Sequence, residues 1–90
     1  MNVVVLPTYN ERENLPHALA RIREVADGHG VQLHTLIVDD ASPDGTGDLV
    51  AARQAMDPRI HLLRRPGKMG LGSAYVAGFR YALAQGAQYV

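Results

Sequence analysis

Residues 2–11 read Asn-Val-Val-Val-Leu-Pro-Thr-Tyr-Asn-Glu, an apolar segment that stops at a proline and gives way to polar and aromatic side chains. The β-branched residues predict a short buried strand at Asn2–Leu6. Pro7 predicts its end, because proline cannot donate a hydrogen bond to a central strand ladder. Open α/β sheets bind ligands at the carboxyl ends of their strands. Tyr9 and Glu11 therefore stand where such a sheet would hold a ligand.

Strands and helices alternate along the rest of the chain. Hydrophobic spacing and turn residues predict a helix capped by Asn14 and ended by Gly28–Gly30, a strand at Leu33–Asp39, a helix at Thr46–Met56, a strand at Ile60–Arg64, a helix at Leu71–Gln85, and the start of a further strand at Ala87–Val90. This β-α-β-α-β-α-β order predicts an α/β fold with parallel strands and right-handed crossovers. Because the last strand breaks off at once, we expect residues 1–90 to be the N-terminal part of a larger domain, incomplete at its C-terminus.

The last of these helices carries two further signals. Tyr75, Phe79, Ala82 and Leu83 recur at the spacing of one helix face. Gly78 lies inside the same helix, where glycine is unfavourable unless the packing requires it. We therefore expect Gly78 to mark close packing against the sheet.

Composition excludes several classes of protein. The chain has 9 basic and 9 acidic residues, whereas a nucleic-acid-binding domain usually has a basic excess. It has no cysteine, which excludes a disulfide framework and a thiolate metal site. Its longest apolar runs fall well short of the ~20 residues that span a bilayer. The four histidines lack metal-ligand spacing.

Two adjacent aspartates follow the second predicted strand. Side chains alternate along a strand, so Val38 and Asp40 point one way and Asp39 points the other. Asp40 is then a candidate for a ligand site, where a carboxylate commonly binds a ribose diol, and Asp39 is a candidate to brace the adjoining loops. The alternatives are a helix cap or a solvated loop acid. For Tyr9 and Glu11, the alternatives to base stacking and hydrogen bonding are packing within the domain and a favourable helix dipole.

Further polar residues follow the second and third strands. Asp44 lies in Ser42-Pro43-Asp44-Gly45, a turn sequence that also explains this residue as a helix cap. Lys68, with Arg64 and Arg65 nearby, is a candidate to attract a diphosphate, although basic residues after a strand are more often solvated. The glycines at 67, 70 and 72 match neither the dinucleotide fingerprint nor a Walker loop.

Taken together, three motifs resemble one family: residues 7–11 (PTYNE), residues 38–46 (VDDASPDGT) and residues 68–75 (KMGLGSAY) followed by Gly78-Phe79. The chain resembles, over essentially all its length, the N-terminal half of the catalytic domain of inverting family-two glycosyltransferases with the GT-A (Rossmann-like) fold. Within them it is most similar to polyprenol (dolichol) phosphate mannose synthases.

The resemblance implies transfer of mannose from GDP-mannose to a polyprenyl phosphate with inversion. It implies that Pro7, Tyr9, Glu11, Val38 and Asp40 hold the guanosine part of the donor, with Asp39 supporting the loop from behind. Asp44 and Lys68 stay supporting candidates on the residue patterns given above. It also implies a cytoplasmic enzyme that works at the cytoplasmic face of a membrane, through its lipid acceptor.

The resemblance further implies a divalent metal, Mg²⁺ or Mn²⁺, held by an Asp-x-Asp motif that would follow Val90. Residues 1–90 would then contain no catalytic residue and no metal ligand, and we expect the chain alone to be inactive. Two alternatives stay open. One is a related glycosyltransferase that moves another sugar, of the UDP-glucose type, onto a lipid or polysaccharide. The other is a non-catalytic α/β module that binds a nucleotide.

Overall fold

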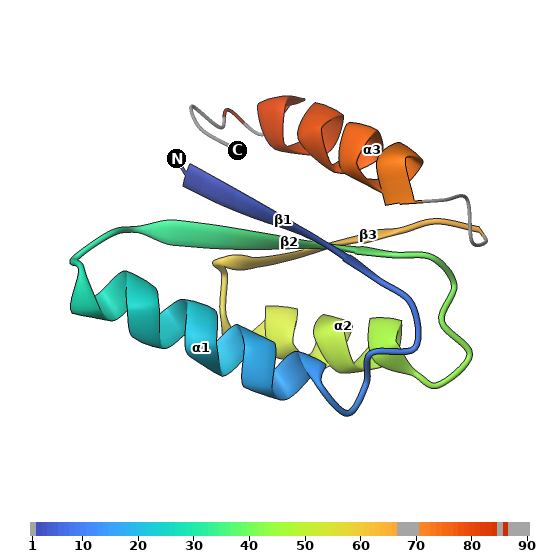
Figure 1. The fold of residues 1–90 in the computed structure, drawn as a ribbon, viewed down its shortest axis with the longest axis horizontal. Helices are drawn as coiled ribbons and strands as arrows, with labels where there is room; N and C mark the ends of the chain where they lie inside the picture. Colours follow the sequence, from blue (N-terminus) through green and yellow to red (C-terminus); the bar gives the residue numbers. More distant parts are fainter. Residues whose placement is uncertain (1, 67–70, 85, 87–90) are drawn as a thin grey trace.

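A computed structural model describes residues 2–66, 71–84 and 86 of the chain. Its elements are, in order, β1 (Asn2–Thr8), α1 (Leu15–Gly28), β2 (Leu33–Asp39), α2 (Thr46–Met56), β3 (Ile60–Arg64) and α3 (Leu71–Ala84). The strands form one parallel sheet in the order β1-β2-β3 (Figure 1). A parallel sheet with flanking helices is the α/β arrangement that the sequence predicted, and it is consistent with a Rossmann-like GT-A fold.

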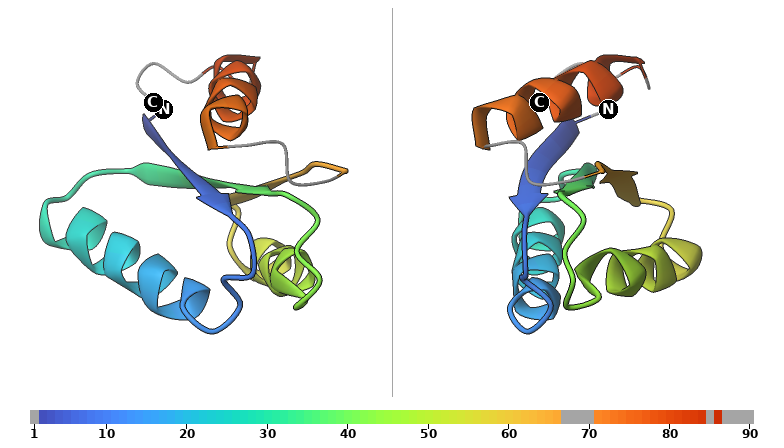
Figure 2. Two further views of the ribbon diagram at one scale, coloured as in Figure 1. Left: turned by 45° about the vertical axis from the view of Figure 1, so that its right-hand side comes forward. Right: turned by 90° about the vertical axis from the view of Figure 1, so that its right-hand side faces the viewer.

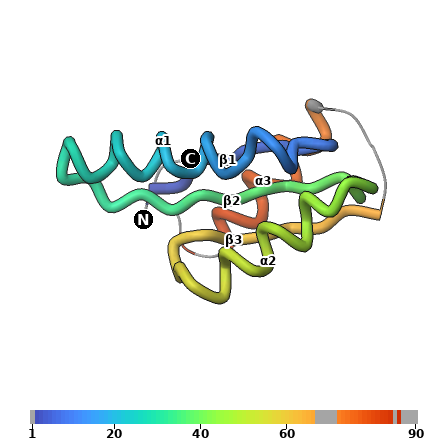
Figure 3. The backbone as a smooth tube through the Cα atoms, turned by 90° about the horizontal axis from the view of Figure 1, so that it is seen from below, coloured from blue at the N-terminus to red at the C-terminus, as the bar shows by residue number. Residues whose placement is uncertain are grey.

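Helices cover both faces of the sheet. α1 and α2 lie on one face and α3 lies on the other (Figure 2). Seen from below, α1 and α2 run along the same face, with α1 nearer β1 and α2 nearer β3 (Figure 3). The middle strand, β2, is therefore covered on both sides, which explains why five consecutive residues from Thr35 to Asp39 are buried.

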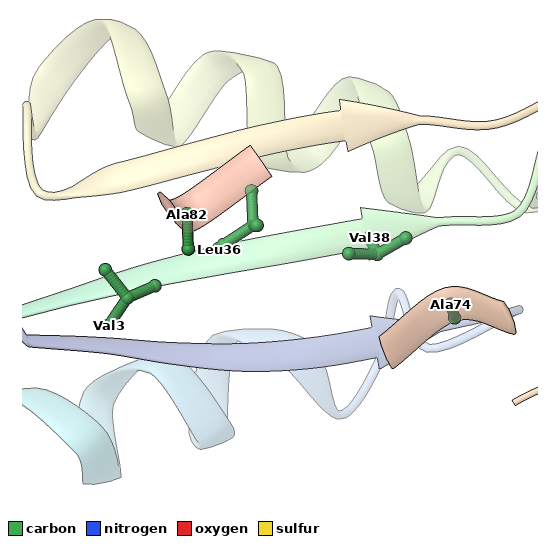
Figure 4. Close-up of a cluster of buried hydrophobic side chains, with 5 residues drawn as sticks. All are labelled: Val3, Leu36, Val38, Ala74 and Ala82. Carbon is green, nitrogen blue, oxygen red and sulfur yellow. The ribbon is translucent and has the colours of Figure 1, made fainter. Parts of the chain in front are cut away.

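Alternation along β2 divides the core into two clusters. Leu36 and Val38 point toward α3 and pack with Val3, Ala74 and Ala82 (Figure 4). On the opposite face, Ile37 packs against residues of both other helices, among them Leu15, Leu19 and Val50. Each face of the sheet thus has its own apolar layer, and the carboxyl ends of the strands lie beyond both layers.

Three elements, β2, α2 and β3, have the bounds predicted from the sequence. β1 runs two residues beyond the predicted end, because Pro7 stays in register with Val38 of β2. Proline is tolerated on an edge strand, and β1 forms an edge among the strands that the structure describes. The predicted strand at Ala87–Val90 and the predicted helix end at Gln85 lie outside the described residues.

α1 begins where predicted, but its capping differs. Asn14 occupies the N-cap position, yet its side chain makes no capping hydrogen bond in the part of the chain that the structure describes. The carbonyl oxygen of Glu11 instead accepts hydrogen bonds from the amides of Asn14 (3.1 Å) and Leu15 (2.8 Å). The backbone turn that precedes the helix therefore provides the acceptor for amides at its start. Pro16 lies in the first turn, as expected.

α3 presents a different face to the sheet from the one that its larger residues suggested. Ala74 and Ala82 are buried against the sheet, while Tyr75, Phe79 and Leu83 are exposed. Gly78 lies between the two alanines, and a Cβ added there would stand 2.5 Å from Val5 Cγ1, so the predicted close packing is confirmed. A stripe of small residues brings the helix backbone close to the strands, which turns the aromatic face outward.

Candidate functional site

Two loops begin side by side at the carboxyl edge of the sheet: the first loop, residues 9–14, and the second loop, residues 40–45. The register places Thr8 opposite Asp39, so β1 and β2 end at the same level. The amide of Asp40 then donates a hydrogen bond to the carbonyl oxygen of Thr8, at 3.2 Å. The ends of β1 and β2 therefore lie side by side at one edge of the sheet.

Consecutive backbone amides of the first loop are bound by side chains from the second loop and the start of α2. The donors are the amides of Asn10, Glu11 and Arg12, and the acceptors are, in that order, Ser42 Oγ (2.9 Å), Thr46 Oγ1 (3.1 Å) and Asp44 Oδ2 (3.1 Å). Since loop amides need partners, this arrangement fixes the path of the first loop. The Ser-Pro-Asp-Gly-Thr sequence therefore shapes the neighbouring loop as well as its own turn.

Asp44 joins the turn to the first loop. Its Oδ1 accepts a hydrogen bond from the amide of Thr46 (3.0 Å) at the start of α2, and the Arg12 guanidinium donates to its carbonyl oxygen (3.2 Å). The hydroxyl of Thr46, the backbone amide of Arg12 and the amide of Thr46 all donate to this carboxylate, and they hold the pKa of Asp44 below its usual value. Gly45 supplies the left-handed backbone (φ 88°) that the turn requires.

Asp39 lies on the opposite face from Val38 and Asp40 and braces both strand ends. Its carboxylate accepts hydrogen bonds from the hydroxyl of Thr8 (2.9 Å) and from the amide (3.2 Å) and hydroxyl (2.6 Å) of Ser42. Each loop contains a residue in the left-handed conformation close to these contacts: Asn10 (φ 56°) in the first loop and Ala41 (φ 52°) in the second. Such backbone strain persists only where surrounding contacts hold it, and it is common at functional sites.

Asp40 forms a buried ion pair with Arg65, the residue that follows β3. Arg65 Nε lies 2.6 Å from Asp40 Oδ1 and Arg65 Nη2 lies 2.9 Å from Asp40 Oδ2, while the two side chains are only 8% and 9% exposed. The hydrogen bonds from Arg65 to Asp40 raise the pKa of Arg65 above its usual value. Arg65 also donates to Ser73 Oγ of α3, at 2.8 Å.

The partnership of Arg65 differs from the solvated role that the sequence suggested for it. The strand register explains the contact between Arg65 and Asp40, because Asp39 pairs with Arg64 across β2 and β3. The residues that follow the two strands, Asp40 and Arg65, then lie side by side, and their side chains meet. The spacing of residues along the chain does not determine how β2 and β3 align, so the sequence could not predict this contact.

The other predicted site residues are distributed around these loops. Tyr9 is 38% exposed at the start of the first loop. Pro7 and Glu11 line a pocket of about 220 Å³ beside the first turn of α1. Val38 is fully buried and is the register partner of Pro7 in the sheet. Lys68 lies outside the described residues.

A second pocket lies beside the start of α2. It has a volume of about 180 Å³, and its lining includes Asp39, Ser42, Gly47, Arg64 and Arg65. In the described ranges, no group of three or more histidine or acidic side chains could hold a metal ion. The carboxylates at this edge, Asp39 and Asp40, are occupied by donors from the protein, so they do not fit a divalent cation.

In the portion of the chain that the structure describes, no helix has the length and apolarity that a membrane crossing requires. The family model for glycosyl transferase family 2 matches residues 3–90. The chain is 51% identical over 84 residues to the undecaprenyl-phosphate mannosyltransferase of Micrococcus luteus, covering 93% of this chain and 33% of that protein. It is 48% identical over 85 residues to the polyprenol monophosphomannose synthase of Mycolicibacterium smegmatis, covering 93% of this chain and 31% of that protein. The chain thus spans about a third of the length of these curated relatives.

Proposed function

Because the chain belongs to glycosyl transferase family 2, we propose that it forms the nucleoside-binding part of an enzyme that transfers mannose from GDP-mannose to a polyprenyl phosphate. The names of the two relatives support a mannosyl donor and a polyprenol phosphate acceptor. Those names specify neither the nucleoside nor the stereochemistry. We propose guanosine as the nucleoside and inversion at the sugar. The acceptor would bring the enzyme to a membrane surface, and we propose the cytoplasmic face.

The observation that carries this proposal is the pairing of the two strand-end loops. Three amides of the first loop are tied to side chains of the second loop and α2, so the two loops form one preorganised edge. The proposed contacts there are a guanine base stacked on the half-exposed ring of Tyr9, and hydrogen bonds from the nucleoside to Glu11 and Asp40. Pro7 would complete the wall, with the buried Val38 supporting it from the neighbouring strand. Base stacking on an aromatic ring is worth about 1–3 kcal/mol.

The proposed reaction is a single displacement at the anomeric carbon of mannose. A phosphate oxygen of the lipid forms the new bond, the bond to GDP breaks, and GDP departs with the electron pair. Attack opposite the leaving group inverts the configuration. The lipid phosphate is already anionic near neutral pH, so positioning and charge stabilisation supply most of the acceleration.

The described residues supply nucleoside binding in this scheme and no step of the transfer itself. We therefore propose that the chain by itself binds the donor without turning it over. A divalent metal, Mg²⁺ or Mn²⁺, belongs to the proposal only for a protein as long as the relatives, because the carboxylates described here do not fit one.

Calorimetric titration of the chain with GDP-mannose, GDP, UDP-glucose and UDP tests the proposed donor. We expect GDP and GDP-mannose to bind with similar affinity, because the contacts are to the nucleoside, and both to bind more tightly than the uridine compounds. Tighter binding of UDP-glucose would instead favour a UDP-sugar enzyme. Failure of all four nucleotides to bind would contradict the proposed function.

A further inference from the structure

Glu11 combines a fixed backbone with an open side chain. Its amide donates to Thr46 Oγ1 (3.1 Å) at the start of α2, and its carbonyl oxygen accepts hydrogen bonds from the amides of Asn14 and Leu15 at the start of α1. Its carboxylate, in contrast, has no hydrogen bond or ion pair among the described residues, and Glu11 lines the pocket of about 220 Å³ beside the first turn of α1. A ligand in that pocket can therefore meet this carboxylate without displacing a protein partner.

Thr46 is the buried residue that holds the amide of Glu11. Its exposed fraction is 0%, and its hydroxyl both donates to Asp44 Oδ1 and accepts from the amide of Glu11. A hydroxyl has one proton, so the bond to Asp44 directs that proton away from Glu11 and leaves an oxygen lone pair for the amide. Asp44 is itself held by the amides of Thr46 and Arg12. Both partners of the hydroxyl lie outside α2, so the hydroxyl serves the two loops and not its own helix.

We propose that Thr46 is a positioning residue for nucleoside recognition, which holds the backbone of Glu11 so that its carboxylate meets the ligand, without contacting the ligand itself. This inference rests on the proposed function, in which Glu11 is one of the nucleoside contacts. A backbone fixed at both its amide and its carbonyl oxygen gives the side chain a fixed origin, so less conformational freedom is lost when the carboxylate binds. Valine in place of Thr46 would keep the shape of the side chain and leave the Glu11 amide without its acceptor.

Matched variants test this role by GDP affinity and by protection of the first loop. Thr46→Val removes the hydroxyl, Thr46→Ser keeps it, and Glu11→Ala removes the carboxylate but keeps the backbone amide. The wild-type chain, these variants and the double variant Glu11→Ala/Thr46→Val are titrated calorimetrically with GDP. Hydrogen exchange of the Glu11 amide is followed without nucleotide. Thr35→Val is the control, since it removes a hydroxyl from another buried threonine, 3% exposed, in the first half of β2.

We expect Glu11→Ala to bind GDP about 10–100-fold more weakly than the wild type, as for the loss of hydrogen bonds to a charged group. Thr46→Val should weaken GDP binding by about fivefold or more, within the range for one lost hydrogen bond, and should speed exchange of the Glu11 amide. Thr46→Ser and Thr35→Val should keep both values near those of the wild type. In the double variant, Thr46→Val should cost nothing beyond Glu11→Ala, since the two residues act as one unit.

Three results would contradict the positioning role. The first is wild-type affinity in Thr46→Val or in Glu11→Ala. The second is a loss in Thr46→Ser as large as that in Thr46→Val, because the hydroxyl would then not matter. The third is an equal cost of Thr46→Val with and without the Glu11 side chain, because the loss would then not pass through Glu11.

Failure of the proposed function gives a different result, in which the wild type binds no GDP. The nucleoside role of Thr46 then fails with it, and the exchange rate of the Glu11 amide shows separately whether Thr46 holds the first loop. Circular dichroism identifies a variant that does not fold. Should Thr46→Val be one, Thr46→Ala takes its place, because the smaller side chain cannot overfill the site.

Discussion

His34 Nδ1 of β2 lies 2.9 Å from His61 Nε2 of β3, and the two rings are stacked with their centroids 5.2 Å apart. Two imidazoles in this contact share one hydrogen bond, which requires at least one nitrogen to be unprotonated. Tyr81 of α3 packs its ring edge-on against His61. The pair therefore links the two strands to the helix on the same face.

The histidine pair should make stability depend on pH. Desolvation, followed by the neighbouring charge of His61, lowers the pKa of His34 in the folded state; the N-terminus and Arg59 act in the same direction, while Asp57 opposes them. The unfolded chain therefore binds more protons than the folded chain as the pH falls through about 6.5, the usual histidine value. The contribution of His34 to the free energy of unfolding is complete above that pH and is lost as the pH falls below it. The melting temperature should therefore fall between pH 7 and 5.

Comparing His34→Gln with His29→Gln tests whether His34 causes this pH dependence of stability. His29 is exposed and follows α1, so its replacement should leave the pH dependence of the melting temperature as in the wild type. Replacing His34 should reduce the slope between pH 7 and 5. Equal slopes in all three proteins would show that the pair does not couple protonation to folding.

Gly78 should tolerate no side chain. Replacing it with alanine places a Cβ 2.5 Å from Val5 Cγ1 and 3.1 Å from Val38 Cγ2, so either these valine side chains or α3 itself must shift. We expect a loss of about 1–3 kcal/mol in the free energy of unfolding, as for overpacked cores. Urea denaturation measures it. Gly72→Ala is the matched control in the same helix, because nothing lies within 4 Å of the added Cβ; a comparable loss there would contradict the packing argument.

Asp39 should contribute more to stability than an exposed aspartate. Asp39→Asn replaces an acceptor of three hydrogen bonds with a group that presents two donors on one side, so one or more of these contacts must be lost. We expect a cost of about 1–3 kcal/mol by urea denaturation. Asp48→Asn, which removes a carboxylate whose side chain is 84% exposed, should change stability by well under about 1 kcal/mol.

Tyr9 should contribute to nucleotide binding through its ring. Tyr9→Ala should weaken binding of GDP by about 1–3 kcal/mol, the usual worth of stacking a base, whereas Tyr9→Phe should retain most of the affinity. Calorimetry gives both values. Unchanged affinity in Tyr9→Ala would show that the ring does not contact the nucleotide. An equal loss in both variants would show that the hydroxyl, and not the ring, makes the contact.

The sequence by itself determined the elements. Period-two and period-3.6 patterns, with turn residues between them, placed β2, α2 and β3 with their observed bounds, because these signals depend on neighbours close along the chain. Alternation also put Asp39 and Asp40 on opposite faces, and the polar residues after β1 and β2 indicated the edge where a ligand site would lie.

Only the tertiary structure decided what those residues contact. The alignment of β2 with β3 pairs Asp40 with Arg65, and the approach of α3 to the sheet favours Ala74, Gly78 and Ala82 over the larger Tyr75 and Phe79. Both outcomes depend on distances between segments remote in sequence. Hydrophobic periodicity reports how apolar a helix face is, and it contains no information on how closely that face must approach its neighbour.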